Sequence, residues 1–331
     1  MKKRIGIPRG LFYYQYFPLW DVFFKELGAE VVLSGTTNKK IFNDGVMVCN
    51  DQTCIPVKTF FGHVMSLIDK VDLLFIPRFT SISKNQYICP KFGGLPDMVR
   101  NTIDGLPEII DVEVNLRKTK KNALKAAISA GKYLTGNRKE ITRAFRKALD
   151  NYRDYRNQLK KGILPIDILE KKLVLLKKPA EDSKNIAVIG HVYNLYDSYI
   201  NMNLIGKLRE NRINIITLDM VEGKDILEKA RTLNKEMFWN FGSKAIGGVM
   251  HLLEEGGLDG IIYVMSFGCG VDSFVCDLIE RKVRRKGNIP FTVITMDEHS
   301  GEAGMRTRIE AFIDMVRWAD NKFKNIPKVS M

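Results

Sequence analysis

Short apolar runs alternate with amphipathic stretches along most of the chain. Eight of these runs have the length and composition of strands, at residues 4–7, 30–33, 45–48, 73–76, 184–189, 213–218, 261–264 and 291–296. Continuous apolar runs of this kind are typical of parallel strands that helices cover on both faces. The fold class is therefore α/β, with two doubly wound domains built on parallel sheets.

The two halves of the chain begin with the same pattern. An apolar strand, an aromatic-rich loop, an amphipathic helix and a second strand follow one another at residues 4–33 and again at residues 184–218. The first of these helices is expected from Leu19 to Leu27, because Gly28 is typical of a helix C-terminus. This repeat predicts a first α/β lobe at residues 1–112 and a second at residues 183–331.

The aromatic loops are further candidate site segments, at residues 10–17 and 191–199. In the second loop Tyr193, Tyr196 and Asp197 are candidate site residues, since rings at this place would shield a cofactor or line a pocket. Ordinary packing between the lobes is the alternative interpretation.

The region between the lobes, residues 113–182, forms a basic helical connector. Apolar residues after Asn137 recur at steps of three and four, which predicts a helix that Asn137 caps. The chain has a formal net charge of +14, and residues 111–180 hold 19 basic and 7 acidic residues. A solvated basic face accounts for this surplus, and a docking surface for an acidic partner is the alternative. Nucleic-acid binding is disfavoured, because no recognised nucleic-acid-binding fold accompanies the charge.

Composition and targeting signals narrow the class of protein. The 331 residues are 45% hydrophobic and 27% charged, as in soluble globular proteins. No apolar run approaches the roughly 20 residues of a membrane span, and the N-terminus resembles a strand rather than a signal peptide. We therefore expect a cytoplasmic protein with no membrane partner. Five cysteines without a secretory signal argue against a disulfide framework.

Three of the cysteines follow predicted strands. Cys54 comes a few residues after the run 45–48 and opens a helical pattern, and Cys89 follows the run 73–76 through a loop. Cys269 follows the run 261–264, between Gly268 and Gly270. In open α/β sheets ligands bind beyond the carboxyl ends of the strands. Glycines beside a cysteine would let the backbone approach a bulky inorganic group.

Thiolates at such positions favour metal chemistry. A helix N-terminus stabilises a thiolate, and three thiolates that meet between two domains would suit an iron–sulfur cluster. With three protein ligands, one iron would keep a position open for another ligand. The alternative is that all five cysteines are small buried hydrophobes.

Polar residues elsewhere are candidates for proton delivery or anchoring. Glu298 and His299 follow the last predicted strand as candidate catalytic residues, together with Asp297 and Arg308. Helix capping by the acids and Ser300 is the alternative. The helix that Cys54 opens contains two further candidates, which are His63 as a donor to a cluster sulfur and Lys58 as a partner for negative charge. A structural histidine and an exposed lysine are the alternatives for these two.

Four segments resemble the 2-hydroxyacyl-CoA dehydratase superfamily, and most closely its stand-alone acyl-CoA dehydratase activase-related branch. They are CIPVKTFFGHV, ICPKFGGLPDM, SFGCGVDSF and TMDEHSGEAGMRTRIEAF. The resemblance implies two flavodoxin-like or Rossmann-like lobes around an oxygen-sensitive cluster, with Cys54, Cys89 and Cys269 as its ligands. A single 4Fe–4S cluster is preferred. A double-cubane 8Fe–9S cluster is the alternative, for which Cys49 and Cys276 would be additional ligands beside one non-cysteine ligand.

The resemblance also implies a class of reaction and a class of partner. Members perform low-potential, electron-dependent reductions and dehydrations, with electrons from an ATP-hydrolysing activase. This sequence contains no GxxxxGK[ST] phosphate loop, so we do not expect it to be an ATPase. We expect an iron–sulfur reductase or dehydratase-like enzyme, supplied by an activase or another electron donor, and relatives imply a homodimer or a pseudo-symmetric heterodimer. The alternative is a non-enzymatic electron-transfer or accessory subunit that docks a partner through its basic helices.

Overall fold

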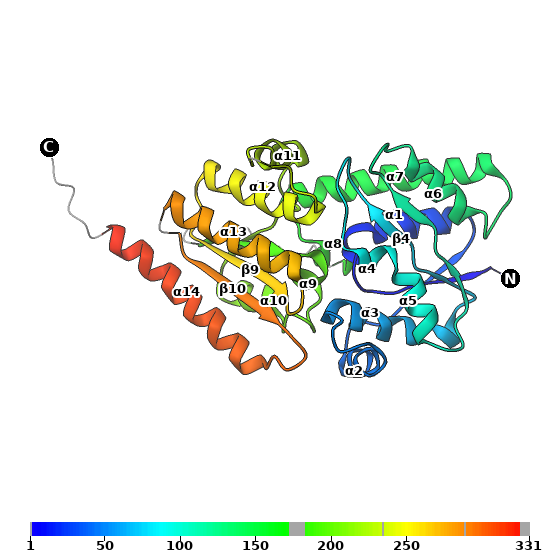
Figure 1. The fold of residues 1–331 in the computed structure, drawn as a ribbon, viewed down its shortest axis with the longest axis horizontal. Coiled ribbons are helices and arrows are strands. Elements are labelled where there is room, and N and C mark those ends of the chain that lie inside the picture. Colours follow the sequence, from blue (N-terminus) through cyan, green and yellow to red (C-terminus); the bar gives the residue numbers. More distant parts are fainter. Residues whose placement is uncertain (1, 172–182, 234, 288, 325–331) are drawn as a thin grey trace.

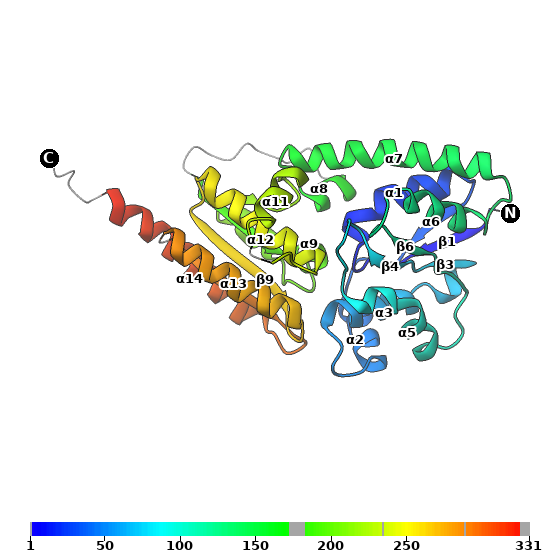
Figure 2. The same ribbon diagram turned by 45° about the horizontal axis from the view of Figure 1, so that its top comes forward.

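Two α/β lobes lie side by side in the computed structural model, which describes residues 2–171, 183–233, 235–287 and 289–324 (Figure 1). The long helix α7 (Arg138–Lys160) runs along the first lobe toward the second (Figure 2). The predicted fold class is thereby confirmed. Residues 172–182, the last part of the predicted connector, lie outside the described residues.

The first lobe is built on a parallel sheet with the order β2-β1-β3-β5. Its strands are β1 (Arg4–Ile7), β2 (Glu30–Leu33), β3 (Leu73–Phe75) and β5 (Glu108–Ile110). The parallel pair β4 (Arg78–Ser81) and β6 (Glu113–Asn115) continues β3 and β5. The amides of Ile76 and Arg78 join the two pairs, because they donate to the carbonyls of Ile110 and Val112 at 3.1 and 3.0 Å.

The second lobe repeats this topology. Its parallel sheet has the order β10-β9-β7-β8, with β7 (Asn185–Gly190), β8 (Asn214–Ile216), β9 (Gly260–Ser266) and β10 (Phe291–Met296). In each sheet the first strand along the chain lies between the second and the third. The order therefore reverses beside the first strand, which is where open α/β sheets bind ligands.

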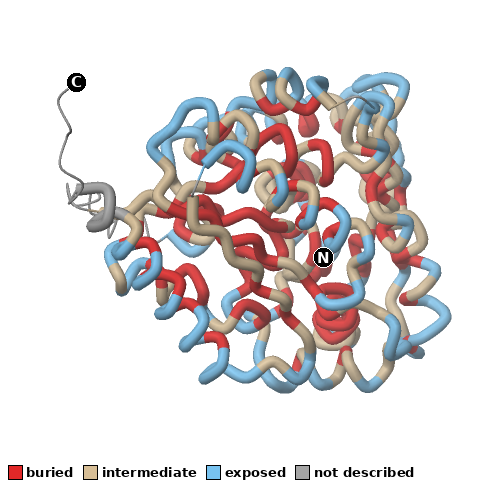
Figure 3. Tube along the Cα trace, turned by 60° about the vertical axis from the view of Figure 1, so that its left-hand side comes forward, coloured by how far each residue is buried: buried red, intermediate tan, exposed pale blue. Residues whose placement is uncertain are grey.

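Helices cover both sheets, and the strands form the buried interior of the molecule (Figure 3). Those of the first lobe and connector are α1 (Tyr13–Glu26), α2 (Lys39–Val48), α3 (Ile55–Met65), η1 (Ile68–Lys70), α4 (Pro90–Gly93), α5 (Leu95–Thr102), α6 (Asn122–Gly131), α7 and α8 (Pro165–Leu169). Those of the second lobe are α9 (Val192–Tyr196), α10 (Leu204–Glu210), α11 (Gly223–Ala230), α12 (Asn240–Glu255), α13 (Gly270–Lys286) and α14 (Glu302–Lys324). None of the described helices is long and apolar enough to cross a membrane.

Helix α7 has the cap and the amphipathic pattern that the sequence predicts. The side chain of Asn137 accepts hydrogen bonds from the amides of Lys139 and Glu140 at 3.0 and 3.3 Å. The apolar stripe is buried against the first lobe, where the hydroxyl of Tyr155 donates to the carbonyl of Tyr14. The basic residues on the outer side of the helix are largely exposed.

Three predicted elements are wrong. Residues 45–48 are not a strand but the last turn of α2, which begins at Lys39 after the cap Asn38. A four-residue apolar run does not distinguish a strand from a helix face, and here it packs α2 on α3. Residues 10–17 are not wholly a loop, because α1 begins at Tyr13 and continues through Pro18 in its second turn. Residues 191–199 are not wholly a loop either, because they contain α9.

The packing of α2 on α3 depends on two glycines. A Cβ on Gly45 would lie 1.9 Å from the carbonyl oxygen of Lys58, and a Cβ on Gly62 would lie 1.7 Å from that of Ile41. The backbones of the two helices therefore touch directly at Lys58 and Gly62 of α3.

We expect Gly62→Ala to destabilise the chain by about 1–3 kcal/mol or more, because the added methyl group must push two helix backbones apart. The measurement is urea unfolding followed by circular dichroism. Gly304→Ala is the matched control, since a Cβ on this helical glycine meets no atom within 4 Å. Alanine is normally favourable inside a helix, so the control should be neutral or slightly stabilising. Equal stability of the two variants would contradict the close packing of α2 on α3.

Candidate metal centre

A cavity of about 160 Å³ lies between the lobes, and Cys54, Cys89 and Cys269 all line it. An engineered protein cavity of about 150 Å³ holds benzene, so this space suits a small group. Figures 1 and 2 show α3 and α13 approaching each other from the two lobes at this boundary. The other lining residues include several rings and a few polar side chains, which are Phe12, Tyr87, Phe92, His191, Tyr193, Trp239, Phe241, Gln15, Lys91, Asp219 and Lys244.

Each of the three cysteines is the N-cap residue of a helix. Cys54 precedes α3, Cys89 precedes α4 and Cys269 precedes α13. The amide of Val57 faces the sulfur of Cys54, and the amide of Asp272 faces the sulfur of Cys269, and each lowers the pKa of its thiol. Free N–H groups at a helix start thus favour the thiolate form, which is the form that binds metals.

Burial has the opposite effect on the pKa values of these thiols. Desolvation raises the pKa of Cys54, and it raises the pKa of Cys269 to about 12. The charge of Asp272 raises the pKa of Cys269 further. The other cavity cysteines raise both pKa values, and Lys91 lowers that of Cys54. Several thiolates this close together in a buried place are stable only beside positive charge, which a bound metal group supplies.

The donor set suits a polynuclear group by its chemistry. The three cavity cysteines offer thiol donors from three separate helix N-termini. Thiolates are the donors that iron–sulfur clusters take from proteins, and each would bind a different iron.

The turn before Cys269 depends on glycine. Gly268 has φ = 78°, a left-handed conformation that side chains disfavour. A Cβ on Gly268 or on Gly270 would meet no atom within 4 Å, so neither glycine is needed for close packing. Gly268 directs the chain from β9 into α13 and so places Cys269 at the cavity.

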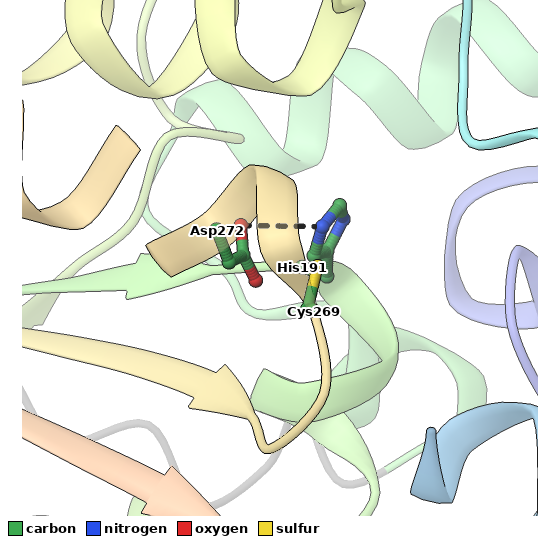
Figure 4. Close-up of side chains that lie close together, drawn as sticks. All are labelled: His191, Cys269 and Asp272. Carbon is green, nitrogen blue, oxygen red and sulfur yellow. Dashed lines mark ion pairs between the residues drawn. The ribbon is translucent and has the colours of Figure 1, made fainter. Parts of the chain in front are cut away.

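The sequence did not single out His191 and Asp272, which lie beside Cys269 (Figure 4). One ligand atom from each of these three residues falls within 4.8 Å of the other two. Nε2 of His191 lies 3.4 Å from Oδ1 of Asp272, which is fully buried. His191 directly follows β7, so the rule about strand ends predicts its position, whereas nothing in the sequence marks Asp272 as buried.

Cys49 and Cys276 do not line the cavity. Cys276 is 5% exposed and packs in the apolar core of the second lobe, near Val275 and Ile279. Cys49 ends α2 and lines a separate surface pocket with Phe61 and Met98. Desolvation raises the pKa of Cys49 to about 11.

The alternative interpretation of Lys58, an exposed lysine, is wrong. Lys58 is fully buried, and its Nζ lies 3.1 and 3.2 Å from Oε1 and Oε2 of Glu298. This ion pair joins α3 of the first lobe to the loop after β10 of the second. Glu298 therefore neutralises a buried charge between the lobes and is not free at the cavity as the sequence analysis expected.

The other candidates near Glu298 also lie away from the cavity. His299 is exposed, and its amide donates to Oδ1 of Asp297 at 2.8 Å. The Ser300 hydroxyl donates to the same oxygen at 3.0 Å, so Asp297 closes the turn before α14. Arg308 is exposed on α14. These hydrogen bonds join the polar groups of residues 297–300 to one another in a local turn.

His63 lies in a second polar contact between the lobes rather than on the cavity wall. Its Nε2 lies 3.0 Å from the hydroxyl of Thr37, and that hydroxyl donates to Oδ2 of Asp197 in the second lobe. Nε2–H is therefore the donor to Thr37. Nδ1 of His63 is buried without a hydrogen-bond partner among the described residues. Desolvation, with a smaller effect of Arg9, lowers the pKa of His63 to about 3.

We expect His63 to make the protein less stable at acidic pH. Below about pH 6.5 the unfolded chain binds a proton at this histidine, and the folded chain does not do so until about pH 3. As the pH is lowered from about 6.5 to about 3, this residue should therefore decrease the free energy of unfolding by about 1.4 kcal/mol per pH unit. Urea unfolding at pH 7, 6, 5 and 4 measures the slope, which should be smaller in His63→Gln. Identical slopes would contradict a buried neutral histidine.

The remaining two candidates have different surroundings. Tyr193 lines the cavity, and its ring stacks on His191 with the centroids 4.8 Å apart. Tyr196 is buried, and its hydroxyl donates to Oδ2 of Asp219 at 3.0 Å. Lys244 also binds Asp219, at 2.9 Å, and both of these charged side chains line the cavity.

Two family models match parts of the chain. Residues 4–221, more than half of the chain, match the model of the CoA enzyme activase uncharacterised domain (DUF2229). Residues 227–316 match the model of the 2-hydroxyglutaryl-CoA dehydratase D-component. The first match contains Cys54 and Cys89, and the second contains Cys269. No curated protein matches the chain.

Proposed function

Because the chain belongs to the CoA enzyme activase uncharacterised domain family and also matches a dehydratase component, we propose that it is an iron–sulfur protein of the 2-hydroxyacyl-CoA dehydratase type. Cys54, Cys89 and Cys269 hold one 4Fe–4S cluster in the cavity between the lobes. The observation that carries this proposal is that three N-cap cysteines, two from one lobe and one from the other, line the same cavity.

The residues around the cavity have three tasks in this proposal. The helix N-termini and Lys91 stabilise the thiolates, as their effects on the cysteine pKa values indicate. The rings of Phe12, Tyr193 and Phe241 exclude water. Three protein ligands leave one coordination position for a small molecule. When bound, the cluster would supply electrons at low potential for a reduction or a dehydration.

Electrons reach this protein from a partner in our proposal. An ATP-dependent activase or another low-potential donor supplies them, in the cytoplasm, to the chain or to a dimer that contains it. The first lobe at residues 1–112 and the second at residues 183–331 then act as the two halves of one cluster site, joined by the connector at residues 113–182.

Iron and acid-labile sulfide analysis after anaerobic reconstitution tests the proposal. About four irons and four sulfides per chain are expected for a single cubane, and about eight irons would indicate the larger cluster. A cluster with an open position should also change its spectrum when a small ligand such as cyanide is added. Protein that binds no iron under these conditions would contradict the proposal.

A non-enzymatic electron carrier is the second candidate, and the exposed basic side of α7 favours it. Arg138, Lys139, Arg143 and Arg146 are all exposed on this helix. An acidic partner would bind there with an affinity that falls steeply as salt rises. A cluster that transfers electrons to such a partner but reacts with no small ligand would favour this function over an enzyme.

A further inference from the structure

We propose that His191, Cys269 and Asp272 form a binding site for a single divalent transition-metal ion, such as Zn²⁺ or Co²⁺, when no cluster is bound. The three ligand atoms, which are a ring nitrogen, a sulfur and a carboxylate oxygen, lie within 4.8 Å of one another (Figure 4). Nitrogen, sulfur and oxygen from these residue types are the ligands that Zn²⁺ takes in proteins.

The topology of the second lobe brings these residues together. His191 directly follows β7, and Cys269 follows β9, which is the strand beside β7. The order of the sheet reverses at this pair of strands, so their carboxyl ends open on the crevice where α/β proteins bind ligands. Asp272 lies in the first turn of α13, three residues after Cys269.

Asp272 has an unused oxygen at this place. Its side chain is fully buried, and Oδ2 has no hydrogen-bond partner in the described part of the chain. A buried carboxylate oxygen without a partner is costly, and a cation beside it removes that cost. This orphaned oxygen is a second observation, independent of the spacing of the three ligand atoms, that indicates a bound cation.

Neighbouring side chains orient the two ligands that are not cysteine. The hydroxyl of Tyr263 donates to Oδ1 of Asp272 at 3.2 Å, and Nε2 of His191 lies 3.4 Å from the same oxygen. The ring of His191 is stacked between Phe241 and Tyr193, with centroids 3.6 and 4.8 Å away. Hydrogen-bonded carboxylates and fixed imidazole rings are typical outer-shell features of metal sites.

The single-ion site and the proposed cluster share Cys269, so a chain holds one or the other. Three protein ligands leave the ion one open position, which faces the cavity that His191 and Cys269 line. A bound Zn²⁺ would therefore block cluster assembly until it is removed. The site does not need Cys54 or Cys89, and this difference separates it from the cluster.

Co²⁺ titration of the metal-free, reduced protein tests the site. We expect one Co²⁺ per chain, with thiolate-to-cobalt charge-transfer absorption and the visible bands of a four-coordinate ion. His191→Ala should weaken binding by more than about tenfold, because even outer-shell changes in metal sites cost about 10–100-fold. Cys269→Ser should abolish the charge-transfer band. Cys54→Ala and Cys89→Ala are matched controls that should bind Co²⁺ as the wild type does.

Two results would overturn the inference. One is binding by His191→Ala at wild-type affinity, and the other is an equal loss in Cys54→Ala or Cys89→Ala, which would mean that the cavity cysteines hold the ion together. Circular dichroism spectra that match the wild type show that each variant is folded. Because no sulfide is present, no cluster forms in this titration. A failed titration would therefore contradict the single-ion site without contradicting the proposed iron–sulfur function.

Discussion

Replacing Cys54, Cys89 or Cys269 with alanine is expected to reduce the iron of the reconstituted protein from about four atoms per chain to less than one. Each thiol binds a different iron in our proposal, and a cubane with two protein ligands left in an open cavity loses its iron on gel filtration. Iron analysis and the electron paramagnetic resonance signal of the reduced protein measure the loss.

Cys49→Ala is the matched control for these variants. Cys49 lies near Cys54, since the charge of Cys54 contributes to the raised pKa of Cys49. It lines a different pocket, however, so its removal should leave the iron content unchanged. A loss of iron in Cys49→Ala equal to that in Cys54→Ala would mean that the cavity does not define the ligand set.

Glu298→Gln is expected to lower the free energy of unfolding of the metal-free protein by about 3 kcal/mol, because it leaves the charge of Lys58 buried and unpaired. The two partners differ in exposure, at 1% for the side chain of Lys58 and 29% for that of Glu298. Lys58→Met should therefore cost much less, since the carboxylate that it leaves behind reaches water. In a variant that carries both Lys58→Met and Glu298→Gln, the free energy of unfolding should be close to that of Lys58→Met alone, because no buried lysine charge is left unpaired.

Asp44→Asn is the control for this prediction. Asp44 pairs with Lys40 at 2.6 Å, and its side chain is 30% exposed, close to the value for Glu298. Its lysine is 82% exposed, however, and an exposed pair of this kind contributes about 0–1 kcal/mol. Urea unfolding of the variants compares the two pairs. Equal costs for Glu298→Gln and Asp44→Asn would contradict a role of the Lys58 pair in joining the lobes.

Much of the fold could be predicted from the sequence because parallel strands buried on both faces have a simple pattern. The runs at β1, β2, β3, β9 and β10 begin and end within a few residues of their predictions. The strand prediction at residues 45–48 is wrong because this segment packs on a helix, and a local sequence pattern does not show the contact between Gly45 and α3.

The candidate site was predictable as far as it depends on strand ends. That rule placed Cys89 and Cys269 correctly beyond strands, while Cys54 follows a helix and reaches the same cavity as the cap of α3. Asp272 and the pairing of Lys58 with Glu298 were missed. Their burial comes from packing between segments far apart in the chain, 240 residues apart for that ion pair, and no local pattern encodes it.

The position of iron in an anaerobic crystal structure of the reconstituted protein tests the account most directly. Anomalous scattering at the iron edge should show one group of iron atoms between the lobes, bonded to sulfurs of Cys54, Cys89 and Cys269. Iron at another place, or bonded to cysteines of one lobe alone, would contradict the claim that the two lobes share one cluster.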